Sequence, residues 1–545
     1  MRTKARFFLG FLGLLLAVSC ISLARSSQGE EYVAAAGAQS LYRLDIAKSR
    51  GTIYDCRLRP LTGSGNRYVA AAAPTIQAIG ALEKATGGQY RDQLALALEN
   101  GKPFQLVLEK PVTDERIDLF RVPKRYEEDQ LAPHIVGYLD SLGGGAAGVE
   151  LAMDDALRRY GGEAAVTYRV DALGRAIAGE ERQVTNTLSR SQGGVALTLD
   201  SGVQALAEEA AAGLGKGAVV VTEAPGCQIR AVASVPDFSP LDLAGASESE
   251  DAPLVNRGFS AYAPGSVFKL VTAAALLEEG LGDSVFSCVG SLNAGGLQFH
   301  CVDNTAHGEL DLNGAIAQSC NCYFINAARV LGGQKVAAMA YNLGFGEEQE
   351  FGRGLWTASG ELPTLRTLQN PRALANFSFG QGELTVTPLQ VCAMLNTIAG
   401  DGISVAPRLI LGLVDEGREL EEVDPPTAEP ARVMSISTAR RLQQAMLQTA
   451  REGTGQAAAP EGVSVAVKTG TAQTGVYEGE EELLHFWYCG IVWEGDSPRW
   501  CVTVLKESSP DGQEDAAAAF RQVVQGLLDL AECGEKKEIL PRDIP

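Results

Sequence analysis

Three short motifs contain the residue types that nucleophilic catalysis needs. In chain order they are Ser266-x-x-Lys269, Ser319-x-Asn321 and Lys468-Thr469-Gly470. A serine hydroxyl becomes a useful nucleophile only when a nearby base accepts its proton, and a lysine acts as that base when it is neutral. Each motif alone is weak, because S-x-x-K occurs by chance in most chains of this length. The three in this order favour a serine enzyme that works through an acyl intermediate.

The first motif stands where a helix is expected to begin. Residues 267–279 predict a helix that ends at Gly280, which places Ser266 at its N-terminus. Free amide donors and the helix dipole stabilise negative charge that develops there. Lys269 lies one turn further along the same face, and burial together with the like charge of Lys468 would lower its pKa toward neutrality. The competing interpretation is a capping serine followed by a solvated lysine.

The second motif falls between two predicted helical segments. Ser319 and Asn321 are therefore expected on a loop, where a hydroxyl could pass a proton to a leaving amine and an amide could orient a substrate. An asparagine that simply caps the following helix is the alternative.

The third motif ends an alternating apolar run and is expected on a β-strand. Gly470 has no side chain, which would let a peptide lie against the strand as an added strand. Lys468 and the hydroxyl of Thr469 or Thr471 suit a terminal carboxylate. The backbone amides of Ser266 and Thr471 would form an oxyanion hole, a feature worth roughly 10²- to 10³-fold in rate per donor.

These motifs need a scaffold, and the periodicity of the chain predicts one of the α+β class. The β-rich runs are 217–222, 228–234, 463–471, 485–493 and 500–507, with a helical block at about 266–400 and an amphipathic helix at 514–532. The first two runs flank a Pro-Gly turn and predict a hairpin. Two strands, a helical insertion, three strands and a helix predict one antiparallel five-stranded sheet with helices on both faces.

Helix caps and turn residues predict three further elements outside this sheet. A helix is expected from Gly148 to about Tyr160, and Asp200 is expected to cap a helix that runs through Gly213. The acidic, Pro-rich residues 419–430 predict an exposed loop.

The N-terminus predicts a membrane anchor. Arg2, Lys4 and Arg6 precede residues 7–24, an uncharged apolar run of 18 residues. Such a helix is about 27 Å long, close to the ~30 Å hydrocarbon core of a bilayer. The positive flank places the N-terminus in the cytoplasm and the rest outside. A cleaved signal peptide, or a lipoprotein acylated at Cys20, is the alternative.

Length and charge bound the remaining possibilities. The 545 residues are enough for two to four domains, and we expect an anchor at 1–25, an N-terminal pedestal domain at 26–190 and a catalytic domain at 191–545. The net charge of −21 argues against a nucleic-acid partner, because phosphate binding needs a concentrated cationic face.

Taken together, the motifs and several flanking stretches resemble the class B penicillin-binding proteins, the monofunctional transpeptidases of bacterial wall synthesis. The matching stretches are Arg50-Gly51 through Asp55, Gly148-Val149-Glu150, Leu197-Thr198-Leu199-Asp200, Pro264-Gly265-Ser266-x-Phe268-Lys269, His307-Gly308, Ser319-Cys320-Asn321, Gly380-Gln381-Gly382, Thr387-Pro388-Leu389-Gln390 and Lys468-Thr469-Gly470-Thr471-Ala472-Gln473. The resemblance implies a small mixed α/β pedestal, a penicillin-binding transpeptidase domain at the cell membrane, and covalent inhibition by β-lactams.

The resemblance also implies a reaction. Ser266, deprotonated by Lys269, attacks the penultimate D-Ala of a stem peptide that ends in D-Ala-D-Ala, and the terminal D-Ala leaves with a proton delivered through Ser319. The amine of a neighbouring stem peptide then releases the acyl group. Because the N-terminal region shows no acidic glycosyltransferase motif, a membrane glycosyltransferase of the division, elongation or sporulation machinery is the expected partner.

Alternative functions are possible if a different nucleophile releases the acyl group, or if the protein does not catalyse a reaction. If water released the acyl group, the protein would be a D-Ala-D-Ala carboxypeptidase or a β-lactamase. A non-catalytic penicillin-binding sensor or scaffold is the alternative from another class. A sensor would need further membrane helices, and no second apolar run of 18 residues is present.

The chain contains 11 cysteines, ten of them beyond the anchor. Disulfides are expected of cysteines in an oxidising compartment, whereas buried free thiols are the default elsewhere. A turn at 494–498, centred near residue 495, would place Cys489 and Cys501 opposite each other or within one residue of it. We expect neighbouring thiols there rather than a disulfide.

A second group of cysteines suggests a metal, although no other cofactor is expected. Cys288, Cys301 and His307 lie in a Gly- and Asn-rich stretch and are ligand types that suit Zn²⁺, with His300 or Asp303 as a candidate fourth ligand. Some elongation-type relatives bind a structural metal near this place, as the resemblance implies. A Cys288–Cys301 disulfide, worth about 3 kcal/mol in the chain-entropy model, and two unconnected thiols are the alternatives.

Overall fold

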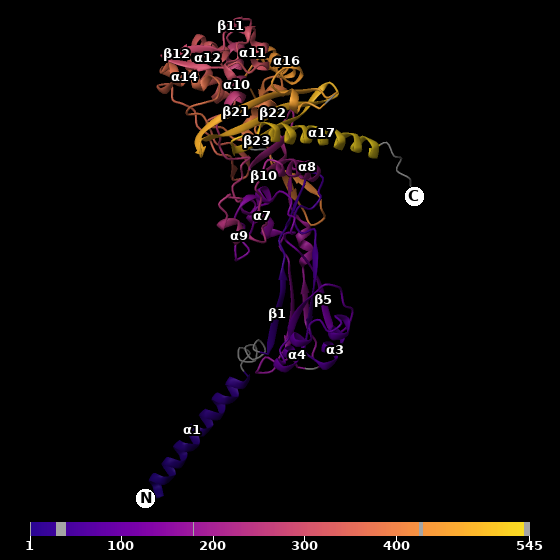
Figure 1. Ribbon diagram of the computed structural model, residues 1–545. Helices are drawn as coiled ribbons and strands as arrows, with labels where there is room; N and C mark the ends of the chain where they lie inside the picture. Colours follow the sequence, from indigo (N-terminus) through magenta and orange to yellow (C-terminus); the bar gives the residue numbers. More distant parts are fainter. Residues whose placement is uncertain (1, 29–39, 178, 424–428, 461, 539–545) are drawn as a thin grey trace. The chain divides into compact units, whose positions relative to one another are not determined.

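The computed structural model describes residues 2–28, 40–177, 179–423, 429–460 and 462–538 (Figure 1). Its internal contacts divide the chain into two compact units. The first is Met1–Gly51, Gly63–Arg125 and Arg159–Gln192, and the second is Thr52–Thr62, Tyr126–Arg158 and Gly193–Pro545. Residues 52–62 and 126–158, which the sequence places in the 26–190 domain, therefore pack with the second unit. For residues 52–62 the cause is the pairing of β2 (Thr52–Tyr54), which lies parallel to β8 (Gly194–Leu197). For residues 126–158 it is a hydrophobic core that Val149 and Leu157 share with residues of β8.

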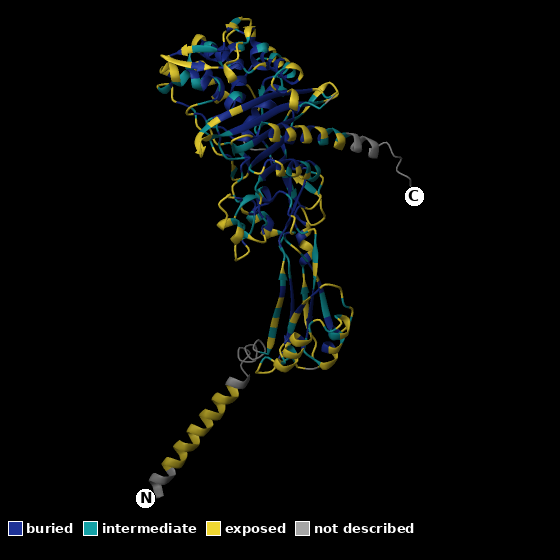
Figure 2. Ribbon diagram, viewed as in Figure 1, coloured by how far each residue is buried: buried dark blue, intermediate teal, exposed yellow. Residues whose placement is uncertain are grey.

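The N-terminal helix α1 (Arg2–Gln28) contains the predicted apolar segment. Residues 7–25 have a mean hydropathy of 2.4, and among the described residues this is the one helix with the length and composition to cross a membrane. All of those residues are exposed (Figure 2).

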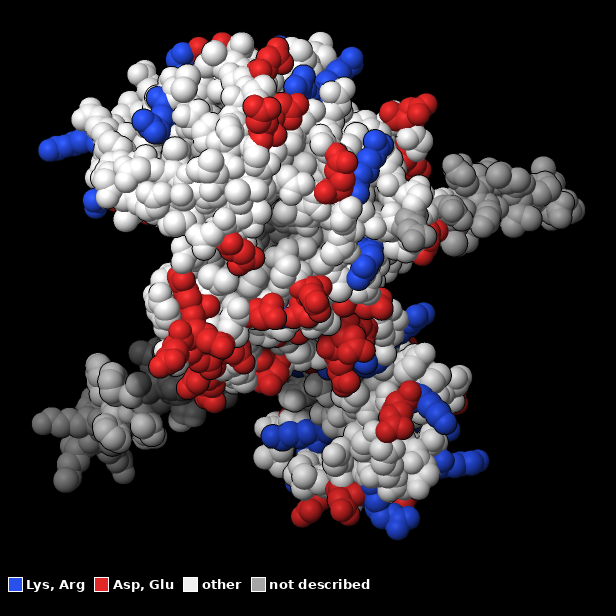
Figure 3. Space-filling view, turned by 45° about the horizontal axis from the view of Figure 1, so that its top comes forward, with Lys and Arg blue, Asp and Glu red and all other residues white. Residues whose placement is uncertain are grey.

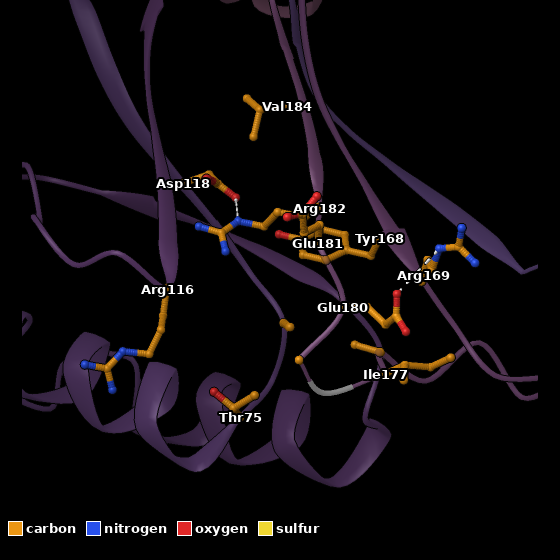
Figure 4. Close-up of a pocket in the computed structure, with 13 residues that line it drawn as sticks. Thr75, Arg116, Asp118, Tyr168, Arg169, Ile177, Glu180, Glu181, Arg182 and Val184 are labelled. Atoms are coloured by element: carbon orange, nitrogen blue, oxygen red, sulfur yellow. Dashed lines mark hydrogen bonds and ion pairs between the residues drawn. The ribbon is translucent and has the colours of Figure 1, made fainter.

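The rest of the first unit is built on two small antiparallel sheets, ordered β1-β6-β7 and β4-β3-β5. Its elements are β1 (Leu41–Lys48), β3 (Asn66–Ala72), α3 (Ile76–Ala85), α4 (Arg91–Asn100), β4 (Phe104–Leu108), β5 (Ile117–Pro123), β6 (Glu163–Arg169) and β7 (Gln183–Asn186). A cavity of about 560 Å³ opens in this unit. Arg182 and Asp118 form an ion pair of 2.5 Å at its rim, beside Tyr168 (Figure 4).

The second unit is built on the predicted five-stranded antiparallel sheet, ordered β10-β9-β23-β22-β21. Its strands are β9 (Gly217–Glu223), β10 (Gln228–Val235), β21 (Val465–Glu478), β22 (Glu481–Glu494) and β23 (Ser497–Ser509). The last three are longer than expected, and for β21 and β22 the reason is that residues 473–484 continue the pairing of these two strands as a largely exposed ribbon.

Alternate residues of the central strands face two different cores, as an internal strand requires. On β22, Trp487 and Ile491 belong to one hydrophobic core, and Tyr488 and Val492 belong to the other. Both faces of the sheet are therefore covered by helices, as the sequence predicts (Figure 2).

The helices of the second unit divide between the two faces. Helices α8 (Ser201–Ala212) and α17 (Gln513–Glu538) contribute to one core. The other core is built by α10 (Lys269–Glu278), α11 (Leu312–Ala317), α12 (Asn321–Leu331), α13 (Gly333–Asn342), α14 (Pro371–Ser378), α15 (Pro388–Ala399) and α16 (Ile436–Glu452). The remaining helices are α5 (Pro133–Val136), α6 (Gly148–Ala152), α7 (Asp154–Arg159) and α9 (Leu243–Glu248).

Smaller sheets complete this unit. They are β19-β18-β8-β2, β11-β14, β12-β13, β15-β16 and β17-β20, with bounds β11 (Phe286–Cys288), β12 (Ser291–Ala294), β13 (Leu297–His300), β14 (Gly308–Leu310), β15 (Glu350–Gly352), β16 (Leu355–Trp356), β17 (Ile403–Ser404), β18 (Ile410–Val414), β19 (Leu420–Glu422) and β20 (Ala431–Arg432).

Local expectations are met in part. Asp200 caps α8 by accepting a hydrogen bond from the Gly202 amide, as predicted. The expected helix at 148–160 is instead two helices, α6 and α7, that break at Met153. The expected loop at 419–430 begins as strand β19, which pairs with β18, and residues 424–428 lie outside the described part of the chain.

The hairpin of β22 and β23 corrects the expected cysteine register. Cys489 pairs with Thr503 rather than with Cys501. A turn centred near residue 495 predicts the direct pair, whereas the observed two-residue turn and a bulge on the β23 side move the pairing by two residues. Both thiols are buried and free.

Acidic side chains gather in clusters on the face drawn in Figure 3, where Lys and Arg side chains stand more singly. This distribution accompanies the net charge of −21.

Candidate active site

Ser266 lies in a tight turn that only a glycine can precede. A 3₁₀ turn spans Gly265–Phe268, and α10 begins at Lys269. Gly265 has a φ of 52°, and a Cβ there would lie 2.4 Å from the Thr471 carbonyl oxygen. The Gly265 amide donates to the Gly380 carbonyl at 3.0 Å. The turn therefore presses the partly buried Ser266 against the end of the third motif.

Lys269 is fully buried, and its ammonium group is surrounded by the second motif. Its Nζ donates to the Ser319 carbonyl at 2.6 Å, to Ser319 Oγ at 3.1 Å and to Asn321 Oδ1 at 2.7 Å. Burial, followed by the like charge of Lys468, holds the pKa of Lys269 well below its usual range. A lowered pKa is what a lysine needs to act as a base at neutral pH.

Lys468 reaches the same hydroxyl from the sheet side. It is fully buried on β21, and its Nζ donates to Ser319 Oγ at 3.0 Å and to the Thr469 carbonyl at 2.8 Å. Burial lowers the pKa of Lys468 to about 7. The Ser319 hydroxyl thus bridges two ammonium groups that both tend to lose a proton, which is an arrangement suited to proton relay.

Ser319 lies in a short loop with a left-handed backbone conformation, just before a helix. Ser319 has a φ of 53°, and α12 begins two residues later with Cys320 as its cap. The Asn321 side chain is fixed at both ends, since its Nδ2 donates to the His300 carbonyl at 2.9 Å and its Oδ1 accepts from Lys269. A backbone carbonyl as partner leaves no signature in the sequence, so this contact was beyond sequence reasoning.

The structure gives a different reason for Gly470 than the one expected. A Cβ at this position would lie 2.8 Å from the Pro264 carbonyl oxygen and 3.0 Å from Val267 Cγ2. The missing side chain therefore makes room for the turn that carries Ser266, and the expected pairing of a peptide with this strand stays a prediction. Because β21 is an edge strand of the described sheet, its outer edge is still able to pair with an extended peptide.

The two threonines of the third motif differ in exposure. Thr469 is buried, and its hydroxyl is hydrogen-bonded to Thr454 at 2.8 Å. Thr471 is exposed and makes a long contact of 3.5 Å with Gln513. Thr471 is thus the hydroxyl of the pair that an incoming carboxylate can reach.

Short strand pairings bring the predicted metal ligands together. Cys288 ends β11 opposite Gly308, which follows His307, and Cys301 follows the β12–β13 hairpin. The Cys288 sulfur lies 3.7 Å from the Cys301 sulfur and 3.4 Å from His307 Nδ1.

The fourth member of this cluster is Cys320, whose sulfur lies 3.7 Å from that of Cys301. The ligand atoms of Cys288, Cys301, His307 and Cys320 all lie within 4.8 Å of one another. His300 and Asp303, the expected fourth ligands, are exposed. Cys320 was not predicted among the metal ligands, because this residue lies inside the Ser319-x-Asn321 motif and not in the Gly- and Asn-rich stretch.

The chemistry of these donors suits a thiophilic metal. Backbone amides donate to two of the sulfurs, from Gly290 to Cys288 and from Tyr323 to Cys320, each at 3.4 Å. Hydrogen bonding with Cys320 and then with Cys322 lowers the pKa of the Cys301 thiol, which favours its thiolate. Three thiols and one imidazole form a donor set typical of tetrahedral zinc.

Known proteins resemble this chain in sequence and in fold. The family described as "Penicillin binding protein transpeptidase domain" matches residues 217–525. Penicillin-binding protein PbpB of Mycolicibacterium smegmatis is 31% identical over 445 residues, covering 76% of this chain and 66% of that protein. Peptidoglycan D,D-transpeptidase MrdA of Haemophilus influenzae is 27% identical over 497 residues, covering 79% and 75%. The chain thus spans just under two thirds of the PbpB relative.

Solved structures share the fold. Penicillin-binding protein 3 of Mycobacterium tuberculosis in complex with aztreonam has a TM-score of 0.63 at 23% identity, covering 92% of this chain and 99% of that one. A chain from a structure titled "Structural coordination of polymerization and crosslinking by a peptidoglycan synthase complex" has a TM-score of 0.68 at 24% identity, covering 96% and 98%.

Proposed function

The chain belongs to the penicillin-binding protein transpeptidase family, and from that premise we propose that it is a peptidoglycan D,D-transpeptidase with Ser266 as its nucleophile. The observation that carries the proposal is the Ser319 hydroxyl, which accepts hydrogen bonds from the buried ammonium groups of both Lys269 and Lys468. The three motifs thereby meet at one point beside the Ser266 turn.

The proposed reaction has two halves. In the first, neutral Lys269 takes the proton of Ser266, whose Oγ attacks the carbonyl carbon of the penultimate D-Ala. The backbone amides of Ser266 and Thr471 hold the oxyanion, and the C–N bond to the terminal D-Ala then breaks. The leaving amine takes its proton through Ser319, which Lys468 can resupply. In the second half, the amine of another stem peptide attacks the acyl-enzyme and frees Ser266.

Substrate recognition follows from which groups are free to make contacts. The stem peptide lies along the outer edge of β21, and the exposed hydroxyl of Thr471 receives its terminal carboxylate. Lys468 is buried and already donates to Thr469 and Ser319, so its positive charge assists the carboxylate through that network. Asn321, held by the His300 carbonyl, keeps the Lys269 ammonium in place. β-Lactams acylate Ser266 by the same route.

The location and partner of the enzyme are part of the same proposal. Helix α1 supports a single-pass anchor with the catalytic unit outside the cytoplasm, where stem peptides are found. A transpeptidase needs glycan strands to cross-link, and we assign their polymerisation to a membrane glycosyltransferase. The similar chain from a peptidoglycan synthase complex supports this assignment.

We further propose that Cys288, Cys301, His307 and Cys320 bind a structural Zn²⁺. The support is the convergence of the four ligand atoms and the two amide hydrogen bonds to sulfur. Such an ion would brace the loop that carries Ser319. Elemental analysis of the purified protein and of its Cys301→Ser variant tests this: about one zinc per chain, lost in the variant, is expected, and a zinc-free unmodified protein contradicts it.

Labelled penicillin tests the nucleophile. The unmodified protein should carry a covalent adduct that peptide mass spectrometry places on Ser266, whereas Ser266→Ala should carry none and Lys269→Ala should fold but fail to react. Full labelling of the Ser266→Ala protein would refute the assignment. A donor peptide ending in D-Ala-D-Ala, offered with and without an amine acceptor, separates the activities, because a transpeptidase forms the new amide and a carboxypeptidase only the hydrolysed acid.

A further inference from the structure

The cysteine cluster contains one sulfur more than the proposed metal site uses. The Cys301 sulfur lies 3.7 Å from those of Cys288 and Cys320, and it lies 3.6 Å from that of Cys322. Cys322 stands outside the group of four converging ligand atoms. All four thiols are at most 3% exposed, and acyl transfer uses none of them.

We propose that Cys301 and Cys322 form a reversible disulfide on exposure to hydroperoxides, and that this disulfide lowers the acylation rate of Ser266. The effect on rate rests on the proposed transpeptidase function. In the zinc-free cluster the step balances as two thiols plus one hydroperoxide giving one disulfide, one alcohol and one water, or two waters from hydrogen peroxide. Where zinc is bound, the Cys301 sulfur must first leave the ion. The Cys301 sulfur is oxidised first to the sulfenic acid, and the Cys322 thiol displaces its hydroxyl as water.

Geometry favours Cys322 as the partner over the other two sulfurs. Backbone amides hold the sulfurs of Cys288 and Cys320 in place, and both belong to the converging group of ligand atoms. The Cys322 sulfur lies 3.6 Å from that of Cys301, and its interaction with Cys301 is stronger than the one it makes with Cys288. A disulfide needs its sulfurs about 2.05 Å apart, so closing this pair requires a movement of about 1.5 Å. Cys301, the sulfur that is oxidised first, is the most exposed of the four thiols, at 3%.

The disulfide would act on a catalytic contact that lies one residue away from each cysteine. His300 precedes Cys301, Asn321 precedes Cys322, and the Asn321 Nδ2 donates to the His300 carbonyl at 2.9 Å. The same amide accepts a hydrogen bond from Lys269 at 2.7 Å. Drawing the two cysteines together shifts both ends of the His300–Asn321 contact and therefore the Lys269 ammonium. A displacement of about 1 Å in a catalytic constellation costs up to about 100-fold in rate, and we expect a loss of about 10- to 100-fold.

The experiment uses the full chain in detergent, with its zinc content measured first. After treatment with hydrogen peroxide and blocking of the remaining thiols, a protease that cuts before aspartate separates the cysteines, because Asp283, Asp303 and Asp311 delimit the peptides. Cys288 and Cys301 fall in peptide 283–302, and Cys322 falls in peptide 311–400. A Cys301–Cys322 disulfide therefore links two peptides, whereas a Cys288–Cys301 disulfide stays within one. Fragmentation of the linked pair identifies the residues.

Acylation by labelled penicillin is measured on the same samples. We expect the linked peptides to appear as the rate falls by about 10- to 100-fold, and both changes to reverse with a dithiol reductant. Cys322→Ser should give no linked peptides and keep its rate under oxidation, whereas Cys56→Ser, with a thiol outside the cluster, should behave like the unmodified protein. Absence of the linked pair after oxidation, or equal inactivation of Cys322→Ser, overturns the proposal. Peptide mapping of the unmodified protein decides the case even if a variant fails to fold. A protein that is not acylated before oxidation refutes the proposed function instead, and the mapping still reports on the disulfide.

Discussion

Replacing Lys468 by methionine should stabilise the second unit near neutral pH while impairing acylation. Lys468 is fully buried, and burial lowers its pKa from 10.5 to about 7. In the unfolded chain the ammonium is hydrated and its pKa returns to the ordinary value. Between these two pKa values the unfolded chain binds one proton more at this site than the folded chain. The free energy of unfolding therefore rises with pH from about 7 upward, and below 7 the charged form reduces stability by its full amount.

The magnitude follows from the two pKa values. A pKa difference is worth ~1.4 kcal/mol per tenfold change, so the whole window corresponds to about 5 kcal/mol and the accessible span from pH 7 to pH 9 to about 3 kcal/mol. Methionine has a similar length and no charge, so it removes this pH dependence. It also removes the like charge beside Lys269, which lets the pKa of Lys269 rise toward its usual value and weakens the pH dependence of that group in the same direction. The difference between variant and unmodified protein should be largest at pH 6 and should shrink as the pH rises.

Tryptophan fluorescence in a guanidinium titration measures this difference in the relevant unit. All four tryptophans lie in the second unit, at positions Trp356, Trp487, Trp493 and Trp500. Lys335→Met is the matched control, because Lys335 is half-exposed and pairs with Glu279 at the surface. Its pH slope should equal that of the unmodified protein. Equal slopes for Lys468→Met and the unmodified protein would refute the reasoning. Acylation of Lys468→Met should fall by about 100-fold, less than in Lys269→Ala.

Two further substitutions probe the turn and the carboxylate contact. Gly265→Ala introduces a Cβ 2.4 Å from the Thr471 carbonyl at a φ of 52° and should lower stability by about 2–4 kcal/mol and acylation by at least about 10-fold. Gly215→Ala, at a φ of 68° in open space, is the control and should show only the backbone strain of about 1–2 kcal/mol in denaturation. Thr471→Val removes an exposed hydroxyl and should weaken acylation by carboxylate-bearing β-lactams by about 10-fold, with the free energy of unfolding nearly unchanged. Unchanged acylation in Thr471→Val would remove that residue from the carboxylate site.

The sequence predicted those parts of the site in which a reactive side chain lies within a clear helix or strand pattern. Lys269 follows Ser266 by one turn, and Lys468 ends an alternating run, so their placement on a helix and a strand followed from local pattern. Local pattern says nothing about how segments far apart in the chain meet. The contact of Asn321 with the His300 carbonyl and the entry of Cys320 into the cluster both depend on such meetings.

The errors have the same origin. The cysteine register failed because one bulge and a tighter turn each move a strand pairing by one residue, and neither has a clear sequence signal. The packing role of Gly470 was missed because the atoms that crowd it, from Pro264 and Val267, are about 200 residues away. The five-stranded sheet was predictable because its strands are apolar on both faces.

The pairing of β8 between β2 and β18 bears on how the protein is made. These three strands come from residues 52–54, 194–197 and 410–414, so the small sheet is completed only after most of the chain has emerged. Until then the apolar side chains of Ile53, Val195 and Leu197, all fully buried in the finished protein, have no permanent cover. Because the chain is made from its N-terminus, β2 must therefore wait unpaired until β8 has been synthesised. Any shortened version that starts at Gly193 would leave β8 without its parallel neighbour, and an expression boundary upstream of Thr52 is the one that preserves it.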